Sequence, residues 1–99
     1  MAQPTRSSDT RDFPARFAAV AETAAFALSF CERHGIDRPA AMRLRLVIEE
    51  LFTNSIQHGY RGECDTPVRI ALAIIDGHVT VQYEDSAPPF DVLARMSTL

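Results

Sequence analysis

The strongest constraint on the fold is a pair of alternating segments joined by Asp76-Gly77. Residues 68–75 and 78–85 each alternate inward and outward side chains, which is typical of β-strands with one buried face. An Asp-Gly pair favours a two-residue turn with positive φ at both residues, so it fixes the register of the hairpin. Three apolar pairs then share one face: Ile70 with Tyr83, Leu72 with Val81, and Ile74 with Val79.

Asp85 is expected on the same face as these pairs, because the register places it opposite Val68. A carboxylate in a core-facing row costs several kcal/mol to bury without a partner. We therefore expect Asp85 to contact a polar group or a ligand. Two strands make a thin sheet, so either a third strand near the N-terminus or a larger assembly is expected to complete it.

Residues 43–60 predict an amphipathic helix with polar side chains along one border of its apolar arc. Glu50, Asn54 and His58 recur at intervals of four and form a single row along that border. Gly59 is expected to end the helix. The arc itself comprises Leu44, Val47, Ile48 and Leu51, with small Ser55 inside it. The water-facing side is predicted to carry Arg45, Glu49 and Thr53.

An earlier helix is predicted to begin at Asp12-Phe13-Pro14, with an acidic residue near the cap and proline in the first turn. His34-Gly35 is expected to end it, and Asp37 with Pro39 to begin the next helix. Residues 1–12 are predicted to be a flexible lead-in, with a short extended segment near residues 11–13. The main apolar stripe of this first helix is predicted to be Phe17, Val20, Ala21, Ala24, Leu28 and Cys31.

A second apolar side of that helix, which carries Ala19, Phe26 and Phe30, needs a partner of its own. It would pack on the lead-in, or it would form a surface for a homodimer or another protein. Together, helix, helix and antiparallel hairpin predict an α+β fold, a two-layer α/β sandwich with two helices on one face of the sheet.

Charge and composition exclude several partners. The net charge is −3 and the 10 basic residues are all scattered arginines, which argues against nucleic acid or an anionic membrane surface. The sequence contains neither an apolar run of membrane-spanning length nor the apolar region of a signal peptide, so we expect a cytoplasmic protein. Cys31 and Cys64 lack metal-type spacing and are expected to be reduced thiols.

Glu50, Asn54 and Asp85 are expected to converge between helix and sheet. A glutamate can accept a proton from a nearby hydroxyl. An asparagine offers an amide oxygen to a hard cation such as Mg²⁺, which keeps most of its waters and shares phosphate oxygens. An inward aspartate accepts hydrogen bonds from an exocyclic amine. These three groups fit a nucleotide site.

Two motifs also resemble a known family. Residues 50–60 (ELFTNSIQHGY) resemble the N box of the GHKL ATPases and are most similar to the anti-sigma-factor serine kinase branch. Residues 85–91 (DSAPPFD) resemble the next box of that branch, Asp-x-Gly-x-Pro-Phe-Asp, with Ala87 in place of its glycine. The likeness covers about residues 13–92, and the two boxes in this order are more specific than either alone.

This resemblance implies a Bergerat-type ATP-binding domain over residues 13–99, with ATP and Mg²⁺ as ligands. Glu50 would match the general base, Asn54 the Mg²⁺ ligand, and Asp85 the aspartate that bonds the adenine amine. His58 would lie near the phosphates, and Ala87 would line the nucleotide site. The implied reaction is phosphoryl transfer from ATP to a serine of an anti-sigma-factor antagonist, by a protein that also holds a sigma factor.

Other interpretations stay open at this stage. The sequence stops before the second glycine-rich box of the family, which carries the ATP lid and the phosphate-binding amides. We therefore expect the 99-residue chain to bind ATP weakly or not at all. A catalytically incomplete binding module that sequesters a partner is the main alternative, with Phe26 and Phe30 in its contact surface. A fragment of a sensor histidine kinase is a weaker one.

Overall fold

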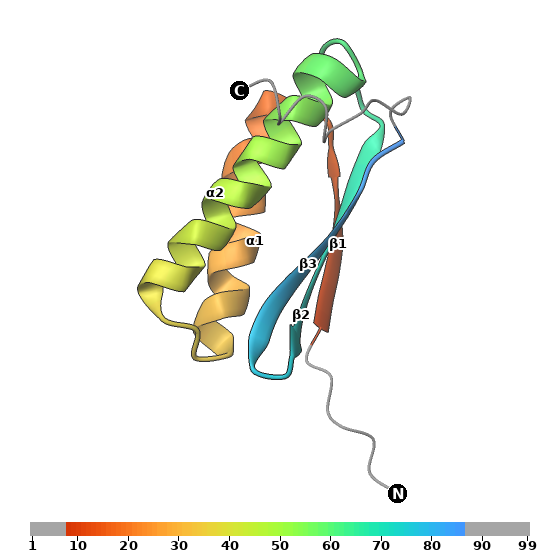
Figure 1. The fold of residues 1–99 in the computed structure, drawn as a ribbon. Coiled ribbons are helices and arrows are strands. Elements are labelled where there is room, and N and C mark those ends of the chain that lie inside the picture. The colour runs from red at the N-terminus through yellow and green to blue at the C-terminus, as the bar shows by residue number, and fades with distance from the viewer. Residues whose placement is uncertain (1–7, 87–99) are drawn as a thin grey trace, which may run out of the picture.

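The fold is an α+β sandwich of two layers, as the sequence predicts. A computed structural model describes residues 8–86, in which two helices cover one face of a three-stranded antiparallel sheet (Figure 1). The strands are β1 (Ser8–Pro14), β2 (Pro67–Ile75) and β3 (His78–Glu84). The helices are the short 3₁₀ turn η1 (Phe17–Ala19), α1 (Val20–Arg33), α2 (Arg38–Asn54) and the π-helical turn η2 (Ser55–Gly59).

The hairpin has the predicted register. β2 pairs with β3 so that Ile70, Leu72 and Ile74 lie opposite Tyr83, Val81 and Val79. Asp76 and Gly77 connect the strands with φ values of 52° and 78°, the positive angles that this turn requires. β3 ends at Glu84, one residue earlier than predicted, so Asp85 directly follows the strand. The residues that face the helices along the hairpin are therefore those that the alternation indicates.

The third strand forms at the N-terminus, and this corrects the predicted start of the first helix. Residues 8–12, expected in the lead-in, belong to β1, which runs to Pro14 and pairs antiparallel with β2. Phe13 lies opposite Val68 and is buried in the core, so its apolar ring stabilises a strand rather than a helix start. The proline closes the strand, where its missing N–H removes no ladder hydrogen bond. Residues 1–7 lie outside the described residues.

The buried face of α1 also differs from the predicted stripe. The residues that α1 and η1 bury are Ala19, Thr23, Ala27, Phe30 and Cys31. Phe17 is 44% exposed, and Phe26 packs edge-on against Phe13 of β1 with 5.7 Å between ring centroids. The side with Ala19, Phe26 and Phe30 is thus the one that faces the sheet, and the two phenylalanines do not form a partner surface.

The helix α2 begins as predicted. Asp37 caps it, with its Oδ1 accepting a hydrogen bond from the Ala40 N–H at 2.9 Å, and proline occupies the first turn. Its buried face is rotated from the predicted arc. Ile48 is fully buried, but so is Phe52, whereas Val47 is 48% exposed.

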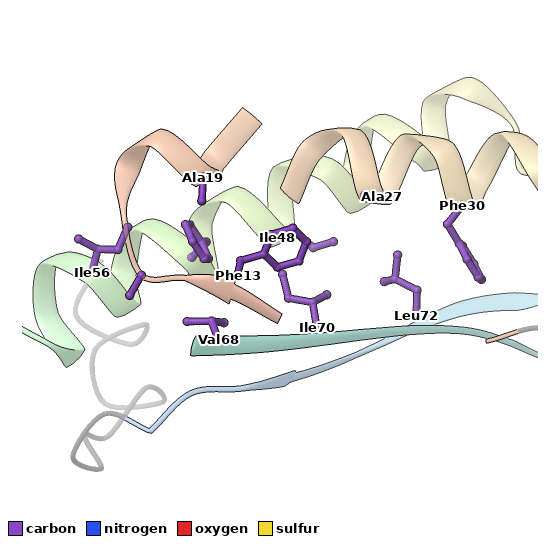
Figure 2. Packing of buried hydrophobic residues seen from close by; sticks show 11 residues of the cluster. Phe13, Ala19, Ala27, Phe30, Ile48, Ile56, Val68, Ile70 and Leu72 are labelled. Atoms are coloured by element: carbon purple, nitrogen blue, oxygen red, sulfur yellow. The ribbon is translucent and has the colours of Figure 1, made fainter. Parts of the chain in front are cut away.

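The core lies between the helices and the inner face of the sheet (Figure 2). Phe13, Val68, Ile70 and Leu72 project from the strands toward the helices. The helical layer contributes Ala19, Ala27, Phe30, Ile48, Phe52 and Ile56, and Ala15 between β1 and η1 completes the buried cluster. None of the helices in residues 8–86 is both long and apolar enough to cross a bilayer.

Candidate functional site

The C-terminal end of α2 widens into a π-helical turn, and the candidate site lies beside it. After Asn54 the chain forms η2, in which the Tyr60 N–H donates to the Ser55 carbonyl oxygen at 2.8 Å. The Gly62 N–H then donates to the Ile56 carbonyl oxygen at 2.7 Å. Gly59 is buried within this turn and does not end a regular helix at His58, contrary to the prediction. Such π turns occur often at functional sites.

Asp85 contacts the first residue of this turn. Its Oδ2 accepts a hydrogen bond of 2.5 Å from Ser55 Oγ, and Ser55 itself is only 3% exposed. The carboxylate therefore points toward the end of α2, and its predicted polar partner is a serine of the apolar arc. Oδ1 makes no hydrogen bond within residues 8–86 and can accept one from a ligand.

Tyr83 of β3 also contacts Ser55, the serine that donates to Asp85. Its hydroxyl lies 2.6 Å from Ser55 Oγ and 3.1 Å from the Leu51 carbonyl oxygen. Burial raises the pKa of the Tyr83 phenol far above its ordinary value, although its hydrogen bond with Ser55 works in the opposite direction. The phenol is therefore protonated at neutral pH and acts as a donor.

Tyr60 holds the backbone on the other side of Asp85. The N–H of Ser86 donates to the Tyr60 hydroxyl oxygen at 2.8 Å. Ser55 thus contacts the Asp85 side chain while Tyr60, at the end of η2, contacts the next residue of the chain. Two hydrogen bonds from one turn fix the position of the carboxylate relative to α2.

Glu50 and Asn54 lie on the open flank of α2 next to these contacts. At 100° per residue, Asn54 is 60° around the helix from Leu51 and 100° from Ser55, the two residues that contact Tyr83. Glu50 lies one turn earlier in the same row and is exposed, whereas Asn54 is half-buried. Asn54 is therefore closer than Glu50 to the residues that contact Tyr83, and no hydrogen bond within residues 8–86 joins either side chain to Asp85.

The structure also places other residues that the sequence predicts. His58 lies in η2 and its side chain is exposed. Ala87 lies outside the described residues. Arg45 and Glu49, predicted to face water, form an ion pair of 2.6 Å and are partly buried.

Comparison with known proteins identifies the family. Residues 13–98 match the histidine kinase-like ATPase domain family, so the match includes the helix row and Asp85. The chain belongs to this family. As a histidine kinase-like ATPase domain, it has ATP as its implied ligand.

Curated relatives of this ATPase domain include the "Serine-protein kinase RsbW" of Listeria monocytogenes serotype 4a (strain HCC23) and of Listeria innocua serovar 6a. Each is 29% identical over 63 residues, which is 64% of this chain. The chain spans 40% of the length of these relatives.

The residues present fit an adenine nucleotide with Mg²⁺. Within residues 8–86 Asp85 Oδ1 has no hydrogen-bond partner and can accept from an amine, and the half-buried Asn54 at the end of α2 offers an amide oxygen. Residues 8–86 contain no cluster of three acidic, histidine or cysteine side chains that could hold a metal by itself.

Three contacts of the site in this ATPase domain go beyond what the sequence predicts. The sequence predicts Ser55 only as a small residue of the apolar arc and Tyr83 only as an apolar partner of Ile70. The structure links both residues to Asp85 and links Tyr60 to Ser86. A signal for Ser55 and Tyr83 was available. Tyr83 and Asp85 are two residues apart on the inner face of the predicted strand 78–85, and Ser55 carries the hydroxyl of the opposing apolar arc.

Proposed function

We propose that this domain is the ATP-binding part of a cytoplasmic serine protein kinase of the anti-sigma-factor type. The contact between Ser55 and Asp85 is the observation that carries the proposal. It brings Asp85, the first residue of the second motif, against the end of the helix that bears Glu50 and Asn54. The curated serine-protein kinases that the chain resembles support the same reaction class.

Each group has a role that its position allows. Asp85 Oδ1 would accept a hydrogen bond from the exocyclic amine of adenine, and Asn54 would ligate Mg²⁺ through its amide oxygen. His58, which follows Asn54 in the row after one further turn, would lie near the phosphates. Bound Mg²⁺ would offset the negative charge of the phosphate groups.

Glu50 would act as the general base. Its carboxylate forms no ion pair within residues 8–86, unlike that of Glu49, so it is available to take the proton of a serine hydroxyl. The serine oxygen then bonds to the γ-phosphorus of ATP as the bond to the bridging oxygen breaks, and ADP leaves. The proposed acceptor is an anti-sigma-factor antagonist, and a sigma factor is the proposed second partner.

Asp85→Asn is expected to weaken ATP binding by about 10- to 150-fold, the range for loss of one hydrogen bond to a charged group. The amide keeps the size of the side chain but removes its charge. Calorimetric titration with ATP and Mg²⁺, extended to millimolar nucleotide, measures the change.

Asp76→Asn is the matched control. It makes the same chemical change in the hairpin turn, at the opposite end of β3, where asparagine tolerates the positive φ of 52°. This variant is expected to bind ATP like the unaltered chain. Equal affinity of Asp85→Asn and the unaltered chain would contradict the adenine role of Asp85.

A further inference from the structure

Three polar groups near the end of β3 form a chain of hydrogen bonds, of which the proposed function assigns a role only to Asp85. Tyr83, Ser55 and Asp85 are linked by contacts of 2.6 Å and 2.5 Å, and Ser55 is almost fully buried. This hydrogen-bond chain ends at the Asp85 carboxylate, which would bind the adenine base. The direction of donation along it therefore decides which oxygen of that carboxylate a ligand can reach.

Counting protons gives the direction. An ionised carboxylate only accepts hydrogen bonds, so Ser55 donates its single hydroxyl proton to Asp85 Oδ2. Ser55 Oγ must then accept in its second contact, so the Tyr83 hydroxyl is the donor there. The same hydroxyl also points toward the Leu51 carbonyl oxygen, at the longer distance of 3.1 Å. The order of donation is Tyr83 to Ser55 to Asp85.

We propose that Tyr83 is a positioning residue for adenine recognition, which it supports through Ser55. The Ser55 hydroxyl, itself held by Tyr83, occupies Asp85 Oδ2 and turns the carboxylate so that Oδ1 remains for the exocyclic amine. This inference rests on the proposed function, because it assumes that Asp85 reads the base. It adds that selectivity between purines depends on a tyrosine that need not touch the nucleotide.

The anchoring of Tyr83 makes it suited to this role. Its ring is packed against the core, and its hydroxyl is fixed by both Ser55 and the last turns of α2. Neighbouring hydrogen bonds polarise one another in a partly buried chain. Donation from Tyr83 to Ser55 therefore strengthens the hydrogen bond from Ser55 to Asp85. Asp85 itself is exposed and would otherwise choose among several rotamers.

The test compares ATP with ITP, whose base carries a carbonyl oxygen in place of the exocyclic amine. Tyr83→Phe and Ser55→Ala in the full chain are each expected to lower the affinity for ATP about three- to tenfold. The affinity for ITP should change by less than about twofold, because its base offers no proton to Asp85. Titrations followed by NMR chemical shifts at millimolar nucleotide with Mg²⁺ measure both constants.

A double-mutant cycle separates positioning from folding. If Tyr83 acts through Ser55, adding Tyr83→Phe to Ser55→Ala should leave the ATP-to-ITP ratio unchanged. Thr80→Val is the control, since it removes a hydroxyl from the same strand that donates to the Ala73 carbonyl oxygen across the hairpin. It should alter neither affinity.

Each outcome is decisive. Equal losses for ATP and ITP in Tyr83→Phe would overturn the inference, as would unchanged ATP affinity. A further loss of selectivity when Tyr83→Phe is added to Ser55→Ala would overturn the route through Ser55. An unaltered chain that binds neither nucleotide at millimolar concentration would overturn the proposed function itself, and with it the role of Tyr83.

Discussion

Glu50→Gln is expected to slow ATP turnover by about 10²- to 10⁴-fold, the usual contribution of a positioned general base. Glutamine keeps the length and planarity of the side chain but cannot accept the proton of the attacking hydroxyl. ATP affinity should stay within about twofold, because a base that acts only in the transition state contributes little to ground-state binding. Release of ADP at saturating ATP and Mg²⁺ measures the rate, with water replacing serine as the nucleophile.

Glu49→Gln provides a closely matched control. The two glutamates are neighbours in the helix, but Glu49 is paired with Arg45 at 2.6 Å on a different side of α2. Loss of a partly exposed ion pair costs about 1 kcal/mol of stability or less and should leave turnover unchanged. Equal rates for the two variants would show that Glu50 is not the base.

Phe52→Ala is expected to lower the free energy of unfolding by about 3–5 kcal/mol. Phe52 is fully buried and packs edge-on against Phe13 of β1, with 6.4 Å between ring centroids. Its loss opens a cavity where α2 meets the N-terminal strand, and a domain of this size has about 5–15 kcal/mol of stability in total. Urea denaturation followed by circular dichroism measures the change.

Leu46→Ala tests the orientation of α2 in the same assay. Leu46 lies on the same helix but is 59% exposed, so its truncation should cost less than about 0.5 kcal/mol. A loss comparable to that of Phe52→Ala would mean that the helix buries the opposite face.

Local chemistry made the hairpin the most predictable part of the fold. Asp76-Gly77 sets the turn and the alternation sets the face, so the pairing of Ile70 with Tyr83 and of Ile74 with Val79 followed directly. The same alternation placed Asp85 toward the helices, and its contact with Ser55 agrees with that prediction.

Tertiary contacts decided what the sequence pattern left ambiguous. Asp12-Phe13-Pro14 matches a helix start locally, but pairing with β2 and burial of Phe13 outweigh that preference. In α2, Phe52 is buried because β1 and α1 both lie on its side, a circumstance that helical periodicity alone does not reveal. When a helix has apolar residues on more than one side, the elements packed against it decide which side is buried.

The relative positions of site residues within one strand or one helix were predictable from the sequence. The contacts between the helix and the strand were not. Glu50 and Asn54 share a row because of helical geometry. The hydrogen bonds of Ser55 with Tyr83 and Asp85 depend on how α2 passes over β3, and the π turn that begins at Ser55 has no signal in the sequence pattern.

An NMR titration of the unaltered chain with ATP and Mg²⁺ tests the central claim, that an adenine nucleotide binds where α2 ends beside β3. We expect backbone amide shifts to change most in residues 54–60 and 83–86. A cleft of about 510 Å³ at the other end of α2, lined by Ile36, Val47 and Val79, provides the internal comparison. Shifts confined to residues 35–37 and 77–79 beside that cleft would contradict this binding site. No shifts at millimolar ATP would contradict ATP binding and favour the catalytically incomplete binding module.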